Sequence, residues 1–363
     1  MKQKLSLQGK GIEELQSEIL NLDLKNWDIK SPLPPTRQLA QDFDVSPSAA
    51  YRLLQKLVSE GKLVAHEING RFYLKEGEAF ATRNLPIACL YKNMENWFFV
   101  ARDQLIGITK ECERLGRGTL LYRHEHLVHH PSMDYPPQFG EVKEQIKSLE
   151  LFFKNQKDNY SAVILDDLWK DEALAPFQEE LSRAVIVGRE TKIKALKSLS
   201  IDFRMAAFKI LAHLHGRGFK RVVIAIPFIG NEAIDQQVAS IQEAAESLGL
   251  PIAKEDLFSA STPPERRALV EGLKKAKERV AIFCPEDNVA TLIYKEIQLQ
   301  GLECPGKIGL LSGMGESGVK ALKISSIMCD YVEMGRRSVI KLFDKSSIKE
   351  EKAMPEFFQG VTT

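Results

Sequence analysis

Residues 33–63 of this chain, LPPTRQLAQDFDVSPSAAYRLLQKLVSEGKL, predict two helices joined by a tight turn. The prolines end just before a short helix predicted over 36–42. A longer helix follows, because Ser46 is a good N-cap, Pro47 suits the first helical position and Gly61 suits the stop. One face of this helix carries an apolar stripe, which consists of Ala50, Leu53, Leu54, Leu57 and Val58. The stripe predicts that this face is buried.

The flanking sequence extends this pair into a small domain. Apolar residues at helical spacing predict an earlier helix over 12–22. Residues 62–66 and 71–74 are two strand-like runs, and Asn69-Gly70 between them is a favoured pair for a tight hairpin turn. The predicted order is therefore helix, helix, turn, helix and hairpin. In a winged helix-turn-helix, the second helix of the pair enters the major groove and the hairpin holds phosphates.

The polar residues of this segment are the candidate contacts to double-stranded DNA. They lie opposite the apolar stripe, at the two helix starts and beside the hairpin turn: Arg37, Ser46, Ser48, Tyr51, Arg52, Gln55, Gly70 and Arg71. Residues 1–75 hold 11 Lys or Arg against 9 Asp or Glu, so a basic surface must be formed by folding. The alternative is a packing unit with no nucleic-acid role.

The stretch 33–63 resembles the winged-helix domain of GntR-type regulators over its full length. The likeness rests on Leu33-Pro34, Arg37, Leu39-Ala40, Val45-Ser46, Leu54, Leu57, Glu60-Gly61 and Gly70. The resemblance implies a DNA-binding domain, which we place at residues 1–78. Tyr51 stands where such proteins usually carry an arginine, so the base preference is expected to differ from the usual one.

Beyond a linker at residues 79–86, short apolar runs alternate with amphipathic helices. The runs are 87–91, 119–122, 162–165, 184–187, 222–226, 280–284 and 308–311. Such alternation predicts an α/β architecture with parallel sheets, whose ligands sit at the carboxyl ends of the strands. The 363 residues, 44% of them hydrophobic, suit a globular chain of two or three domains. No apolar run is long enough to cross a bilayer.

Residues 87–363 resemble the effector-binding domain of LacI-type regulators, which is similar to the two-lobed periplasmic sugar-binding proteins. The likeness is carried by IACLYKNMENWFF (87–99), SIDFRMAAFKILAHLHGRGFKRVVIA (200–225), AIFCPEDNVA (281–290) and YVEMGRRSV (331–339). It implies a periplasmic-binding-protein type I fold with two Rossmann-like lobes: lobe 1 at about 87–190 and 325–345, lobe 2 at about 192–323 and 350–363. With the winged helix, the chain is similar to AraR-type hybrid repressors, and both resemblances imply a homodimer.

The LacI-type resemblance also places a small-molecule site between the lobes. By position, the cleft residues of the family fall on Tyr91, Asn96, Trp97, Phe98, Arg189, Asp202, Gln237, Glu286, Asp287 and Met314. Aromatic faces pack on sugar rings and carboxylates accept bonds from hydroxyls, so the expected effector is a sugar or a sugar-derived molecule. Gln237, Glu286 and Met314 replace the usual arginine, asparagine and aspartate, so the familiar hexose ligands are not assumed.

Two other patterns in the sequence resemble a dinucleotide site and a metal site, but neither is expected to be one. Residues 313–318 match GxGxxG, but only 319–323 is left for the helix that a dinucleotide site needs. A proline-interrupted loop holds possible metal ligands, namely His124, His126, His129, His130 and Asp134. That loop lacks the rigidity of metal sites, so no metal is expected. The 5 widely spaced cysteines are expected to be reduced thiols, and neither a cofactor nor an enzymatic activity is expected.

Taken together, these patterns predict a cytoplasmic, DNA-binding transcription regulator, with repression the expected sign. A small molecule between the lobes would re-angle the two subunits of a homodimer and change their fit to operator half-sites. One alternative is a regulator whose degenerate sensor binds no ligand and serves only dimerisation. Another is an enzyme that carries a helix-turn-helix, as in regulators with a pyridoxal-phosphate aminotransferase fold.

Overall fold

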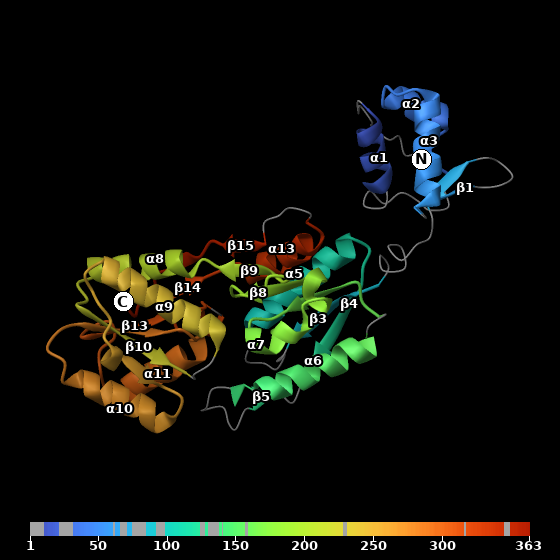
Figure 1. Cartoon of the computed structure of the whole chain (residues 1–363). Coiled ribbons are helices and arrows are strands. Elements are labelled where there is room, and N and C mark those ends of the chain that lie inside the picture. Colours follow the sequence, from blue (N-terminus) through green and yellow to red (C-terminus); the bar gives the residue numbers. More distant parts are fainter. Residues whose placement is uncertain are drawn as a thin grey trace. The chain divides into compact units, whose positions relative to one another are not determined.

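The chain divides into two compact units, Met1–Leu85 and Pro86–Thr363 (Figure 1). This computed structural model describes residues 11–21, 32–60, 62–65, 71–74, 85–91, 99–123, 128–129, 138–139, 141–156, 159–227, 231–315, 317–344 and 349–363. Among the predicted site residues, Gly70, Asn96, Trp97 and Phe98 lie outside the described residues, as does most of the histidine-containing loop.

The small unit consists of helices packed on a two-stranded antiparallel sheet. The elements are α1 (Ile12–Asn21), α2 (Thr36–Asp42), α3 (Pro47–Ser59), β1 (Leu63–Ala65) and β2 (Phe72–Leu74). The Oγ atom of Ser46 accepts a hydrogen bond from the N–H of Ala49 at 3.2 Å, so Ser46 is the N-cap that the sequence predicts. Leu15 of α1, Leu39 of α2 and Leu57 of α3 meet in one buried core.

The first sheet of the larger unit has six strands in the order β15-β9-β8-β7-β3-β4. Their bounds are β3 (Ile87–Tyr91), β4 (Thr119–Arg123), β7 (Ala162–Leu165), β8 (Ala184–Gly188), β9 (Lys197–Ile201) and β15 (Glu350–Ala353). All neighbouring strands of this sheet run parallel. One face is covered by α5 (Phe99–Arg114) and α13 (Tyr331–Phe343). The other is covered by α6 (Val142–Gln156) and α7 (Asp171–Leu174) with the short η2 (Ala175–Phe177) and η3 (Glu180–Arg183).

The second sheet has six strands in the order β11-β10-β12-β13-β14-β16, and β16 alone pairs antiparallel. Their bounds are β10 (Arg221–Ile226), β11 (Leu257–Ser259), β12 (Val280–Cys284), β13 (Ile308–Ser312), β14 (Ser325–Met328) and β16 (Glu356–Phe358). Helices α8 (Phe203–Gly216) and α9 (Glu232–Ser247) cover one face. Helices α10 (Pro263–Lys274), α11 (Asp287–Leu299) and α12 (Ser317–Ala321) cover the other.

The remaining short elements lie outside both sheets. They are η4 (Lys254–Asp256) and an antiparallel pair of β5 (Val128–His129) with β6 (Gln138–Phe139).

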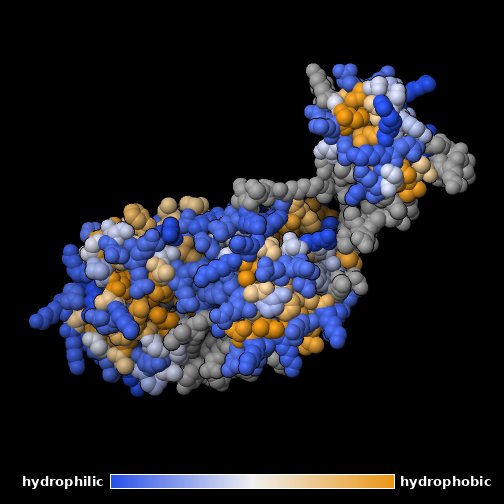
Figure 2. Space-filling view, in the orientation of Figure 1, coloured by the Kyte–Doolittle hydropathy of each residue, from blue (hydrophilic) through white to orange (hydrophobic). Residues whose placement is uncertain are grey.

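The central strands form because their residues are apolar on both sides. Every residue of β3, β7, β8, β12 and β13 is buried, as expected for parallel strands between two helix layers. Hydrophilic residues cover much of the face of this unit seen in Figure 2, with apolar patches among them on both lobes. Each sheet with its helices makes one lobe.

The chain passes between the lobes three times, after β9, after β14 and after β15. This differs from the lobe limits expected from the sequence. β9 and β15 belong to the first lobe although they fall within the expected limits of the second. β14 belongs to the second lobe although it falls within the expected limits of the first. β15 (EEKA) lies at the edge of the sheet and is mostly polar, whereas β9 (KSLSI) is buried but contains serine at alternate positions. Neither strand therefore forms an apolar run that the sequence would show.

Helices α5 and α13 touch backbone to backbone. A Cβ atom added to Gly335 would lie 1.9 Å from the carbonyl oxygen of Gln104, and one added to Gly107 would lie 1.8 Å from the carbonyl oxygen of Val332. Only glycine fits at such distances, so these two residues set the separation of the helices.

The cysteines form no disulfide bond in the structure. All the cysteines are free, with Cys89, Cys112 and Cys284 buried, and burial raises the pKa of the Cys112 thiol to about 11. Within the described ranges, no helix combines the length and the apolar character needed to cross a bilayer, and no group of three or more His, Cys, Asp or Glu could hold a metal ion.

Candidate functional site

The outer face of α3 presents polar side chains to solvent. Ser48, Tyr51, Arg52 and Gln55 are all exposed, with Tyr51 50% exposed. The Nε2 atom of Gln55 donates to the Oη atom of Tyr51 at 2.9 Å, so these two side chains form one polar surface. The Tyr51 ring meets Phe72 of β2 edge-on, with 6.0 Å between ring centroids, which joins this face to the hairpin.

The other predicted DNA contacts that the structure describes are also exposed: Arg37 in α2, Ser46 before α3 and Arg71 before β2. The long polar face of α3 and the apolar stripe beneath it therefore have the division that a groove-binding helix needs.

A cleft lies between the two lobes of the larger unit, at the carboxyl ends of strands from both sheets. The space measures about 740 Å³, open solvent at its mouth included. The first lobe contributes polar and apolar residues, among them Gln104, Asp166, Asp167, Gly188 and Ile201. The second contributes Asn231, Gln237, Glu286, Gly313 and Met314, while Phe203 and Tyr331 enter from the crossover segments. Concave sites between domains that are lined by apolar groups and a few convergent polar groups suit small molecules.

Three of the predicted effector residues line this cleft, namely Gln237, Glu286 and Met314. The Nε2 atom of Gln237 donates to the carbonyl oxygen of Gly313 at 3.2 Å, so the loop after β13 is held against α9. Glu286 is the N-cap position of α11 and 8% exposed. Met314 follows β13, and its carbonyl oxygen accepts a bond from the hydroxyl of Tyr331 at 2.9 Å.

Three other predicted residues do not line the cleft, and the side chain of each is bonded within the protein. Tyr91 is completely buried under the cleft; burial raises its pKa well above the usual value, and its hydroxyl donates to Oε1 of Gln104 at 3.0 Å. Asp202 caps α8 by accepting from the N–H of Met205 at 3.0 Å. Asp287 accepts from the N–H groups of Met314 and Gly315, which shapes the loop after β13.

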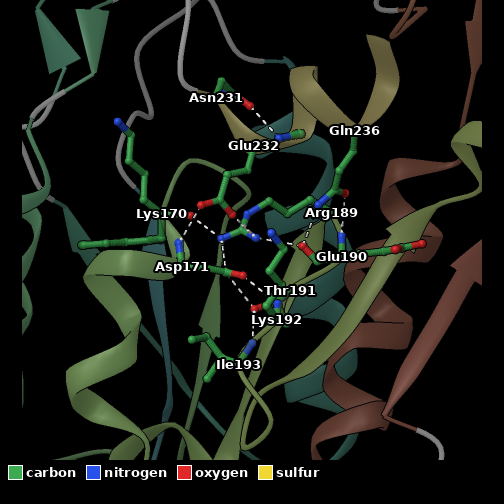
Figure 3. Close-up of polar contacts among 12 residues, drawn as sticks. Lys170, Asp171, Arg189, Glu190, Thr191, Lys192, Ile193, Asn231, Glu232 and Gln236 are labelled. Atoms are coloured by element: carbon green, nitrogen blue, oxygen red, sulfur yellow. Dashed lines mark hydrogen bonds and ion pairs between the residues drawn. The ribbon is translucent and has the colours of Figure 1, made fainter. Parts of the chain in front are cut away.

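Arg189 also lies outside the lining, and it joins the two lobes instead (Figure 3). Its guanidinium is 0% exposed and forms ion pairs with Asp171 of α7 at 2.8 Å and with Glu232 of α9 at 2.6 Å. Because Arg189 and Asp171 belong to the first lobe and Glu232 to the second, one buried cation bridges the lobes. The N–H of Asp171 adds a hydrogen bond to Oε1 of Glu232 at 2.9 Å.

A second pair of bonds lies beside this ion pair. The N–H of Glu190 donates to Oε1 of Gln236, and Nε2 of Gln236 donates back to the carbonyl oxygen of Glu190, both at 3.0 Å. We call Asp171, Arg189, Glu190, Glu232 and Gln236 the inter-lobe latch. Burial alone would raise the pKa of Asp171, but Arg189, the amide of Lys192 and the hydroxyl of Thr191 together hold it below its ordinary value.

The cleft also contains residues that sequence reasoning did not single out. Asp166 and Asp167 directly follow β7, and Asn231 caps α9 by accepting from the N–H groups of Ala233 and Ile234. The two aspartates could have been found, because polar residues after an apolar run mark the carboxyl end of a strand. Gly313 of the GxGxxG pattern lines the cleft as well, but the helix that follows it, α12, spans only Ser317–Ala321.

The comparisons with known proteins agree with the two-lobed architecture. Residues 211–358 match the family model described as a periplasmic binding protein-like domain. A search of curated proteins found no match. Among solved structures, a LacI-family regulatory protein from Chloroflexus aggregans superposes with a TM-score of 0.63 at 16% identity, covering 76% of this chain and 97% of that one.

Two further solved structures give similar values. The Escherichia coli transcriptional repressor ascG superposes with a TM-score of 0.59 at 14% identity. The match covers 77% of this chain and 99% of the ascG chain. A LacI-family transcriptional regulator from Lactobacillus casei with bound sucrose has a TM-score of 0.57 at 16% identity, with coverage of 77% and 99%. At these identities the likeness shows the fold. The larger unit therefore has the periplasmic binding protein-like fold found in LacI-family transcription regulators.

Proposed function

We propose that this protein is a ligand-controlled transcriptional repressor that binds double-stranded operator DNA as a homodimer. The small unit acts as a GntR-like winged helix-turn-helix, and the two-lobed unit binds a small-molecule effector in its cleft. A change in lobe closure re-angles the subunits and alters the spacing of their α3 helices on the half-sites.

The observation that carries the DNA-binding part is the exposed polar face of α3, which rests on an apolar core and lies beside the β1–β2 hairpin. Ser48, Tyr51, Arg52 and Gln55 are the proposed groove contacts. Arg37, Ser46 and Arg71, with Gly70, are the proposed backbone contacts, since basic side chains and helix-start amides bind phosphates.

The cleft supports the effector part. Its position between the lobes and its mixed lining suit a small molecule, and the Lactobacillus casei regulator of the same fold was solved with sucrose. The proposed effector contacts are Gln237, Glu286 and Met314, with Asn96, Trp97 and Phe98 from the segment outside the described residues. A degenerate sensor that serves only dimerisation remains the second candidate, and ligand titration separates the two.

Arg52→Ala is expected to weaken operator binding by about tenfold, because an arginine that contacts a base edge contributes roughly 1–3 kcal/mol. The measurement is an electrophoretic mobility shift with DNA from upstream of the protein's own coding region, repeated at several salt concentrations.

Arg183→Ala is the matched control, because Arg183 is exposed on η3 of the larger unit. Its affinity should equal that of the wild type. Equal losses in the two variants, or no shift of any fragment by the wild-type protein at low salt, would contradict DNA binding through α3.

A further inference from the structure

The charge of the cleft lining is one-sided. Among its described residues, Asp166, Asp167 and Glu286 carry carboxylates, and none carries a Lys, Arg or His side chain. Asp166 is 4% exposed and Glu286 8% exposed, so these charges are largely removed from bulk water. They come from both lobes, since Asp166 and Asp167 follow β7 and Glu286 follows β12. Lobe closure therefore brings like charges toward one another.

The neighbouring buried cation does not offset this charge. Arg189 is already paired with Asp171 and Glu232, and Glu190 is paired with Lys352, so the three carboxylates of the latch outnumber the two cations that pair with them.

Uncharged groups of the lining add contacts for a polar molecule with a cationic end. Gln104 and Gln237 provide amide groups, and Phe203 and Tyr331 provide aromatic surface. Carboxylates form their strongest hydrogen bonds with protonated amines, and aromatic faces attract cations. An anionic ligand would meet carboxylates at low effective dielectric, where repulsion is strong.

We propose that the cleft takes a ligand that bears a protonated amine, such as an amino sugar or a polyamine, in preference to neutral sugars, sugar phosphates or carboxylates. This inference rests on the proposed function, because it assigns a ligand class to the effector cleft. The amine lies among Asp166, Asp167 and Glu286 and couples the two lobes through opposite charge, so its binding favours the closed form.

Titration calorimetry on the full chain tests the charge preference with matched probes. Glucosamine and spermidine are the cationic probes, N-acetylglucosamine is the neutral partner of glucosamine, and glucose 6-phosphate is the anionic one. At least one cationic probe should bind with a Kd tenfold or more below those of the neutral and anionic probes. Equal or tighter binding of N-acetylglucosamine or glucose 6-phosphate, or no binding of either cation, overturns the proposal.

Variants locate the binding in the cleft. Asp167→Asn and Glu286→Gln should each raise the Kd of the cationic probe about tenfold, whereas Glu271→Gln on the exposed side of α10 should leave it unchanged. An unchanged Kd in both cleft variants also overturns the proposal. The mobility-shift experiment is independent: DNA binding together with a preference for a neutral probe would leave the proposed function standing and remove only the amine.

Discussion

Gly335→Ala is expected to lower the melting temperature of the two-lobed unit by roughly 6–12 °C. The added methyl group would lie 1.9 Å from the carbonyl oxygen of Gln104 and 2.8 Å from its carbonyl carbon, both backbone atoms that cannot rotate away. Helices α5 and α13 must therefore separate, and over-packing of this kind costs about 3 kcal/mol. Calorimetry of the full chain measures the shift.

Gly272→Ala provides a matched control for this prediction. Gly272 lies in α10, and a Cβ atom added there meets nothing within 4 Å. Alanine is the better helix former, so this variant should be as stable as the wild type or more stable by up to about 1 kcal/mol. If the two variants melt alike, the helices are not held at backbone contact by Gly335.

Arg189→Met is expected to destabilise the two-lobed unit by about 3 kcal/mol and to open its lobes. Methionine keeps much of the side-chain volume but leaves Asp171 and Glu232 facing each other without the cation between them. Removal of one partner from a buried ion pair typically costs 3–5 kcal/mol, and the partial exposure of Glu232 places this case at the lower end. Denaturant titration gives the free energy of unfolding, and small-angle scattering gives the radius of gyration.

Two comparisons isolate the latch. Arg204→Met removes a surface cation that is 74% exposed and lies 3.5 Å from Glu243, so it should change the free energy of unfolding by less than about 0.5 kcal/mol. The double variant Arg189→Met with Glu232→Gln should recover part of the loss, because the unpaired carboxylate is gone. Two results together would show that the latch does not join the lobes: the effects of the two substitutions on the free energy of unfolding simply add, and the radius of gyration stays at the wild-type value.

The latch should also respond to acid. The pKa of Asp171 is lowered in the folded protein, so its stabilising effect is present above its ordinary pKa and is lost as the pH falls through the lowered value. At neutral pH the latch is therefore complete.

Local patterns were enough to predict the elements that position the sites. The bounds of α2 match the prediction, and α3 begins at the expected Pro47, because a capping residue and an apolar stripe lie within a few positions of one another. The buried strands β3, β7 and β12 were equally clear, since nearly all of their residues are apolar, as is usual for strands covered on both faces. β9 and β15 were not, since they are poor in apolar residues.

The cleft was only partly predictable for a different reason. Gln237, Glu286 and Met314 were placed in the cleft by the LacI-type resemblance, whereas Asp166, which directly follows the apolar strand β7, was missed. The LacI-type resemblance placed Arg189, which follows β8, among the ligand contacts. In the folded protein, the Arg189 guanidinium pairs with Asp171 and with Glu232, which is distant in sequence and close in space. No local sequence pattern shows whether a guanidinium will pair with such carboxylates or with a ligand.

The placement of β15 and β16 has a consequence for synthesis on the ribosome. β15 completes the edge of the first sheet and β16 the edge of the second, although they are the last two strands of the chain. Until β15 and β16 have been translated, β9 and β14 are the edge strands of their sheets, so neither lobe can complete its sheet before these two strands emerge. During that interval, the nascent chain would benefit from chaperone protection against edge-to-edge aggregation.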